Sequence, residues 1–170
     1  MAKRIYQYYV EGQDEKALIN SLKSELQCIE AGKVDVFNMV QDTMTSARLR
    51  PLKTGTRVVL VYDTDVHDLN KVNTLKKNIS ILKRHAAVKD VLCIPQVLNL
   101  EDALIDSCDI KSVTDITHSK SKGDFKRDFI RCKNLGSRLK ACRFDKEKLW
   151  LKIPQNDFSA FGNDAQKVKT

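Results

Sequence analysis

The sequence lacks the features that mark membrane-spanning, secreted or disulfide-stapled proteins. No uninterrupted apolar run approaches the roughly 18 residues that indicate a membrane-spanning helix. The five cysteines are odd in number and form no C-x-x-C pair, which argues against a disulfide framework, a zinc site and thiol exchange. The start, MAKRIYQYYVEG, passes straight into a strand-like run without a signal-peptide core, so we expect a cytoplasmic protein.

Repeats, low-complexity linkers and the G-x-x-x-x-G-K-[ST] motif of P-loop ATPases are also missing. The three histidines, His67, His85 and His118, stand at no metal-ligand spacing. The chain has 170 residues, of which 42% are hydrophobic and 31% are charged. That length is enough to bury one core without disulfides or a structural metal, so we expect one globular domain.

What the sequence has in excess is positive charge, most of it in one segment. The net charge is +8, and nine lysines and arginines fall between Lys120 and Arg143, against only Asp124 and Asp128. Concentrated positive charge is what neutralising a phosphate backbone requires, so we expect DNA or RNA as a partner. The candidate nucleic-acid contacts are Lys120, Lys122, Lys126, Arg127, Arg131 and Lys133.

Strand-like and helix-like segments alternate over residues 1–107. The run RVVLVY at 57–62 is apolar throughout, typical of a strand buried on both faces of a parallel sheet. The alternation predicts an α/β fold with a mostly parallel sheet of about four strands flanked by helices. The other expected strands are 4–10, 34–40 and 89–97; the expected helices are 14–31, 41–50, one that Asp68 caps, and 100–107.

Residues 108–170 depart from this alternation and predict a basic helical extension packed on the same domain. Residues 109–124 are polar and loop-like, whereas 124–143 carry an apolar stripe that includes Phe125 and Phe129, with basic residues opposite. Burial against the sheet is the commoner use of such a stripe; stacking on bases is the alternative. We expect the apolar patch at 149–153 to dock and the final residues of the polar tail that starts at Pro154 to fray.

Carboxylates directly follow two of the predicted strands. Glu11 follows the first, and Asp63 and Asp65 follow the third. Ligands of parallel sheets sit outside the carboxyl ends of the strands, so these side chains meet if the two strands are neighbours. Such carboxylates repel one another without a cation, and oxygen ligands of this kind suit Mg²⁺ or Mn²⁺. The alternative is helix capping, for which Asp14 and Asp68 are good candidates.

The sequence YYVEGQDEKAL, followed in the third predicted strand by VVLVYDTDVHD, resembles the TOPRIM domain of topoisomerases, primases and OLD-family nucleases. The likeness covers roughly residues 4–107 and implies a Rossmann-like TOPRIM fold. It implies that Glu11 is a general acid or base and that Asp63 and Asp65 hold the metal. Glu15 matches a further acidic residue of the OLD and RloB-like branches. Val66-His67 depart from the glycine-containing continuation of many TOPRIM proteins.

Two later features resemble the OLD and RloB-like nucleases. In IPQVLNLEDALID a strand is followed by Asn99, Glu101 and Asp102, which implies a further metal ligand at Glu101. In GDFKRDF, Lys126 stands where those proteins often carry a lysine near the scissile phosphate. The alternatives are an acidic first helical turn for Glu101 and Asp102, and a solvated basic face for Lys126.

The resemblance implies metal-dependent hydrolysis of phosphodiester bonds in DNA or RNA, in a setting such as phage defence. Strand passage by a topoisomerase would need a nucleophilic tyrosine in a separate domain. All four tyrosines fall in predicted strands, so hydrolysis is favoured; they are Tyr6, Tyr8, Tyr9 and Tyr62. One alternative is a non-catalytic or partner-activated TOPRIM module that binds nucleic acid, with a separately encoded ATPase or as a homodimer. Another is a phosphatase of the haloacid dehalogenase type, in which an apolar strand also precedes D-x-D.

Overall fold

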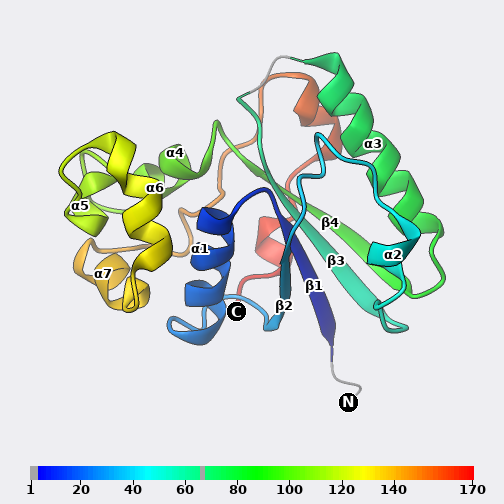
Figure 1. The fold of residues 1–170 in the computed structure, drawn as a ribbon, viewed down its shortest axis with the longest axis horizontal. Helices are drawn as coiled ribbons and strands as arrows, with labels where there is room; N and C mark the ends of the chain where they lie inside the picture. Colours follow the sequence, from blue (N-terminus) through cyan, green and yellow to red (C-terminus); the bar gives the residue numbers. More distant parts are fainter. Residues whose placement is uncertain (1–3, 66–67) are drawn as a thin grey trace.

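A four-stranded, all-parallel sheet with helices on both faces forms the centre of the computed structural model, which describes residues 4–65 and 68–170 (Figure 1). The α/β, Rossmann-like prediction is therefore confirmed. Val66 and His67, which follow the D-x-D sequence, lie outside the described residues. The strands are β1 (Ile5–Val10), β2 (Gly32–Val36), β3 (Thr56–Asp63) and β4 (Val88–Gln96), in the order β2-β1-β3-β4.

The order of the strands creates a switch point between β1 and β3. After β1 the chain adds β2 on one side, and it then crosses back to place β3 on the other side. Val10 pairs with Val61, so the residues that follow β1 and those that end β3 emerge at the same edge of the sheet. Crevices at such switch points are where open α/β sheets bind ligands.

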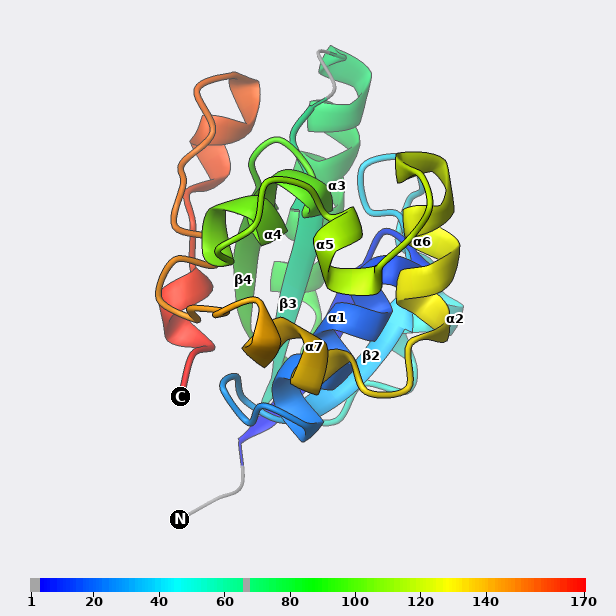
Figure 2. The same cartoon turned by 90° about the vertical axis from the view of Figure 1, so that its left-hand side faces the viewer.

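One face of the sheet is covered by α1 and by the helices of the second half of the chain. The side chains of Tyr8, Val10, Val59 and Val61 point to this face and share one core with those helices. Figure 2 shows α4 to α7 in front of the sheet. The helices are α1 (Gln13–Ser24), α4 (Leu100–Ser107), α5 (Thr114–Thr117), α6 (Lys122–Arg131) and α7 (Leu135–Ala141).

The other face of the sheet packs against α3 (Leu69–Arg84), the short α2 (Ser46–Leu49) and the 3-10 helix η1 (Asp157–Phe161). Tyr9, Leu60 and Tyr62 alternate with the residues of the first face and share a second core with these elements. Asp68 caps α3 as predicted, because its Oδ1 accepts a hydrogen bond from the Asn70 backbone N–H at 2.8 Å.

The first helix is shorter than its apolar spacing predicts. It ends at Ser24, and Gln27 adopts a left-handed φ of 50°, so the residues up to Ala31 form a loop rather than helical turns. Gly32 belongs to β2, where a Cβ would lie 2.6 Å from the Tyr6 backbone oxygen. The glycine therefore serves the close approach of two strands and does not end the helix.

The basic segment forms two helices where one long helix is predicted. Helix α6 ends at Arg131, and α7 begins at Leu135. Gly136 lies in α7, where its N–H donates to Glu25 Oε2 at 3.0 Å and a Cβ would lie 2.7 Å from the Glu25 Cβ. The predicted loop at 109–124 also contains the short helix α5.

The tail from residue 154 docks on the domain up to its last residues, for which the sequence predicts fraying. Phe158 and Val168 are buried, and a second 3-10 helix, η2 (Ala165–Lys167), precedes the end of the chain. The Thr170 N–H donates to the Cys28 backbone oxygen at 3.1 Å. In the preceding patch the prediction of docking holds for the buried Leu149 and Trp150, whereas Leu151 and Ile153 are exposed.

All five cysteines belong to the described residues, and each is a free thiol, as the sequence predicts. Cys28 and Cys93 are buried, and the other three are half-buried. No helix among residues 4–65 and 68–170 is both long and apolar enough to cross a membrane.

Candidate active site

Glu11 and Asp63 meet at the carboxyl ends of β1 and β3. The Asp63 backbone N–H donates to Glu11 Oε1 at 3.4 Å, so the two strands place these side chains next to each other. Asp65 follows two residues after Asp63, on the exposed side of the same edge. The convergence expected of strand-end carboxylates is therefore present for Glu11 and Asp63, with Asp65 near enough to influence both.

Two more carboxylates enter from the first turn of α1. Asp14 and Glu15 are both buried. Gly12 is the N-cap of this helix, and Asp14 makes no capping hydrogen bond, so the interpretation of Asp14 as a cap is wrong. A Cβ on Gly12 would lie 2.7 Å from Asp14 Oδ1 and 2.9 Å from Glu15 Oε2. Gly12 therefore leaves the space that the two carboxylates occupy.

Burial and mutual repulsion make these acids hold their protons more tightly than usual. Burial, followed by the charge of Asp63, raises the pKa of Glu11 to about 8. Burial also raises the pKa of Asp63 to about 7, against a hydrogen bond from Gln96 that favours the anion. The pKa of Glu15 is raised by burial and by its hydrogen bond with Asp14. A cation at this edge would relieve the repulsion.

A cleft of about 380 Å³ opens beside the carboxylates. It joins the end of β3 to the start of α4, the loop after α4 and the exposed side of α6. Its lining carries both signs of charge: the acidic residues Asp63, Asp65, Glu101 and Asp102, together with Asn99, share it with Lys111, Lys122 and Lys126. Ile105, Val113 and Phe125 supply the apolar part. Acidic and basic groups thus share one cavity.

Helix α4 begins at the edge of this cleft, and its first residues place Asn99 and Glu101 in the lining. Asn99 is the N-cap, and its Oδ1 accepts from the Asp102 N–H at 3.0 Å. Glu101 lies in the first helical turn, where the helix dipole favours a carboxylate, as the alternative of an acidic first turn predicts. Its side chain also lines the cleft, and its charge raises the pKa of Asp63. Both interpretations of Glu101 fit the structure.

Lys126 reaches the acidic cluster from α6. Its Nζ lies 3.3 Å from Asp14 Oδ2. Partial burial disfavours its charged form, but the carboxylates of Asp14 and Glu101 outweigh burial and raise its pKa. Phe125 and Phe129 flank it in sequence and are buried against α1, with ring centroids 5.1 Å apart. They anchor α6 and are not exposed for stacking on bases.

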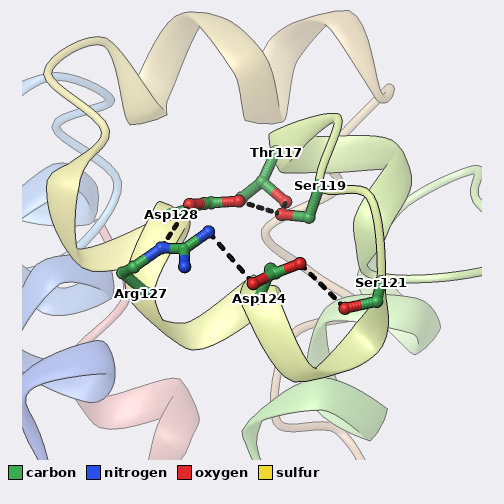
Figure 3. A network of polar contacts seen from close by, with 6 residues as sticks. All are labelled: Thr117, Ser119, Ser121, Asp124, Arg127 and Asp128. Atoms are coloured by element: carbon green, nitrogen blue, oxygen red, sulfur yellow. Dashed lines mark hydrogen bonds and ion pairs between the residues drawn. The ribbon is translucent and has the colours of Figure 1, made fainter.

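The remaining basic residues of the extension do not form one uniform face. Lys120, Lys122, Arg131 and Lys133 are exposed, but of these only Lys122 lines the cleft. Arg127 is held by Asp124 at 3.0 Å and by Asp128 at 3.1 Å. Hydrogen bonds from Ser119 and Ser121 to these aspartates complete the network (Figure 3). The charge of Arg127 is therefore partly neutralised, whereas an arginine that binds phosphate is expected to have its charge free for the ligand.

Sequence reasoning missed three residues of the site. Asp14 enters the sequence analysis only as a candidate helix cap, although its place beside Glu15 after a strand end marks it as a candidate acid. Gln96 is the last residue of β4, and its amide Nε2 donates to Asp63 Oδ1 at 2.7 Å. The strand-end rule that selects Glu11 and Asp63 also selects Gln96. Lys111 lies in a loop and carries no signal in the sequence.

A larger cavity, of about 520 Å³, lies at the opposite end of the sheet, near the start of β1 and β2. Its charged lining consists of Arg4, Lys33 and Lys53, and it contains no carboxylate. With neither an acid–base pair nor a metal ligand, this cavity offers less chemistry than the cleft at the carboxyl ends.

The donor set fits Mg²⁺ or Mn²⁺ in its chemistry, without forming a ready-made cage. Within residues 4–65 and 68–170, no three or more His, Cys, Asp or Glu side chains are grouped closely enough to hold a metal ion. Yet Glu11, Asp63 and Glu15 are carboxylates gathered at one edge with raised pKa values, which is the electrostatic situation that a divalent cation stabilises.

Comparisons of the chain with protein-family models, with curated proteins and with solved structures found no match. The TOPRIM resemblance therefore depends on the residues quoted from the sequence, and a functional assignment depends on the geometry of this site.

Proposed function

We propose that the chain is a metal-dependent phosphodiesterase that hydrolyses DNA or RNA at the carboxyl ends of β1 and β3. One observation carries the proposal: a single cleft joins Asp63, Asp65 and Glu101 to Lys111, Lys122 and Lys126. Phosphodiester hydrolysis needs both kinds of group, because acids hold a metal and move protons, whereas lysines bind the phosphate.

The residues divide into three roles. Asp63, Asp65 and Glu101 would hold Mg²⁺ or Mn²⁺, with Glu11 beside Asp63 as a further candidate ligand. The bound ion would supply charge stabilisation at the phosphate. Lys122 and Lys126 line the same cleft, so their ammonium groups can contact non-bridging phosphate oxygens.

Glu11 and Glu15 are the candidates for proton transfer. In the metal-free protein the pKa of Glu11 is raised to about 8, so this carboxyl group can both release and accept a proton near neutral pH. Its Oε1 accepts from the Asp63 N–H, so the proton belongs on Oε2. Glu15, one helical turn further on, is a second buried carboxyl group with a raised pKa. An OLD or RloB-like setting with a separately encoded ATPase depends on the sequence resemblance alone.

The first test is cleavage of single- and double-stranded DNA and RNA with Mg²⁺ or Mn²⁺. We expect the wild type to cut at least one substrate, EDTA to stop it, and Asp63→Asn to lose the activity. Asp90→Asn is the matched control, because Asp90 lies near the amino end of β4 and pairs there with Arg57 at 3.2 Å. Equal cutting by wild type and Asp63→Asn would contradict the proposal.

A binding module without catalysis is the second candidate. Two observations favour it. Lys126 already forms an ion pair with Asp14, and no group of three candidate metal ligands occurs among the described residues. Nucleic-acid binding without cleavage of any substrate, at saturating metal, would support it. Hydrolysis of p-nitrophenyl phosphate but not of nucleic acid would instead favour a phosphatase.

A further inference from the structure

Gln96 connects the candidate metal ligand Asp63 to the C-terminal segment. It is fully buried, and in the sheet its backbone is the register partner of Asp63. Its Nε2 donates to Asp63 Oδ1 at 2.7 Å, and its Oε1 accepts from the Trp150 indole Nε1 at 3.2 Å. Both ends of the amide are therefore used, as a buried polar group requires.

The indole fixes which end of the amide faces the carboxylate. An indole N–H can only donate, so the oxygen of Gln96 must face Trp150 and the NH₂ group must face Asp63. If the amide were reversed, two oxygens would meet at Asp63 and two N–H groups at Trp150. Trp150 thus sets the orientation of Gln96, and Gln96 occupies Oδ1 of Asp63.

Trp150 is itself held by the C-terminal segment. Its side chain is buried, and its backbone adopts a left-handed φ of 57°. Its carbonyl oxygen accepts from the Asn163 Nδ2 at 2.7 Å. Asn156 of the same segment donates to the Thr64 oxygen at 2.8 Å, next to Asp63 in the chain. The segment that follows α7 therefore supports the edge of the sheet where Asp63 stands.

We propose that Gln96 and Trp150 are positioning residues that orient the Asp63 carboxylate for a divalent cation. This inference rests on the proposed function, because the orientation matters only if Asp63 binds the ion. With Oδ1 held by the amide, Oδ2 is the oxygen that no other described residue hydrogen-bonds. Outer-shell partners of this kind commonly change metal affinity by about 10- to 100-fold when they are removed.

The experiment measures Mn²⁺ affinity on the full chain, by the electron paramagnetic resonance of free Mn²⁺. We expect Gln96→Leu to weaken binding by about 10- to 100-fold, and Trp150→Phe, which keeps an aromatic ring but removes the donor, to weaken it less. Gln7→Leu is the matched control. Gln7 is also buried and also donates to an aspartate, Asp35 Oδ2 at 3.0 Å, but it lies away from the carboxyl ends.

Trp150 gives an independent readout, because it is the only tryptophan of the chain. Mg²⁺, which does not quench fluorescence by paramagnetism, should change the tryptophan emission of the wild type and leave that of Asp63→Asn unchanged. If Gln96→Leu fails to fold by circular dichroism, Trp150→Phe still tests the arrangement by Mn²⁺ binding.

The outcomes separate the two claims. If wild type binds Mn²⁺, Asp63→Asn does not, and both Gln96→Leu and Trp150→Phe bind within twofold of wild type, the positioning role is overturned and the metal site stands. If wild type does not bind Mn²⁺ at all, the proposed function and the positioning role are both overturned.

Discussion

The ammonium of Lys126 lies 3.3 Å from Asp14 Oδ2 and ties α6 to the first turn of α1. The Lys126 side chain is 61% exposed, whereas that of Asp14 is 7% exposed, so the pair is buried on one side only. Asp14 Oδ2 makes no hydrogen bond within the described residues, which leaves Lys126 as its charged partner. The pair therefore matters for the placement of the lysine and for the charge of the acid.

Lys126→Ala should destabilise the fold, because it leaves the buried Asp14 carboxylate without its partner. We expect a loss of about 1 to 2 kcal/mol in the free energy of unfolding, less than for a fully buried pair, because solvent screens the lysine. Urea denaturation measures the loss, with Lys120→Ala as an exposed control on the same segment. Asp14→Asn in the Lys126→Ala background should restore part of it. Equal stability of wild type and Lys126→Ala would show that the pair is not formed in solution.

Glu11→Gln should stabilise the metal-free protein at neutral pH while abolishing cleavage. The pKa of Glu11 rises from 4.5 to about 8 on folding, so between these values the folded state binds more protons than the unfolded state. The contribution of Glu11 to stability therefore falls as pH rises through this window, and it is most favourable below it. A glutamine side chain does not titrate, so the variant does not lose this stability as the pH rises.

The measurement for Glu11 is urea denaturation in EDTA at several pH values between about 5 and 8, the window in which the raised carboxyl pKa acts. The advantage of Glu11→Gln over wild type should grow with pH by at most about 1.4 kcal/mol per pH unit. Saturating Mg²⁺ should remove the advantage, because the ion stabilises the anionic cluster of the wild type. A stability difference that is independent of pH would contradict the raised pKa.

Lys122 and Arg127 should contribute unequally to nucleic-acid binding, although both belong to the basic segment. Lys122 lines the cleft, whereas Arg127 is engaged by Asp124 and Asp128. A lysine that neutralises one phosphate contributes about one unit to the slope of log affinity against log salt. Lys122→Ala should therefore reduce the slope by about one, and Arg127→Ala by clearly less.

Fluorescence anisotropy with labelled single- and double-stranded oligonucleotides, over a salt series, gives these slopes. Lys140→Ala is the control, because Lys140 is exposed on α7 and does not line the cleft. Equal effects of all three substitutions would show that the nucleic acid contacts the segment without using the cleft.

The parts of the fold that follow from periodicity were predictable. The apolar run of β3 and the alternation of strands and helices gave the parallel sheet, and neighbouring β1 and β3 brought Glu11 to Asp63. The roles of Asp14 and Gln96 were not predictable in the same way, because they depend on contacts with Lys126 and Trp150, which are far away in the sequence. Side-chain partners across the fold leave no periodic signal.

The C-terminal tail shows why polar composition misled the prediction. Its buried residues, such as Phe158 and Val168, are single apolar side chains among polar ones, so no stripe marks them. The contacts of the tail are made with the sheet: the Phe158 ring centroid lies 5.8 Å from that of Tyr62, and the Asp164 N–H donates to the Cys93 oxygen at 2.7 Å. A polar segment can therefore dock through a few apolar side chains and backbone hydrogen bonds, which its composition does not reveal.

Phe158→Ala tests whether the tail is docked in solution. The side chain is 1% exposed and packs on the face of the sheet that carries Tyr62, so its removal should cost about 3 to 5 kcal/mol of unfolding free energy. Ser159→Ala, at the exposed neighbouring position, should change stability by less than about 0.5 kcal/mol. Urea denaturation compares the two. A frayed tail would give both variants the stability of the wild type. If the tail is docked, only Phe158→Ala lowers the free energy of unfolding, because only the phenylalanine ring is buried.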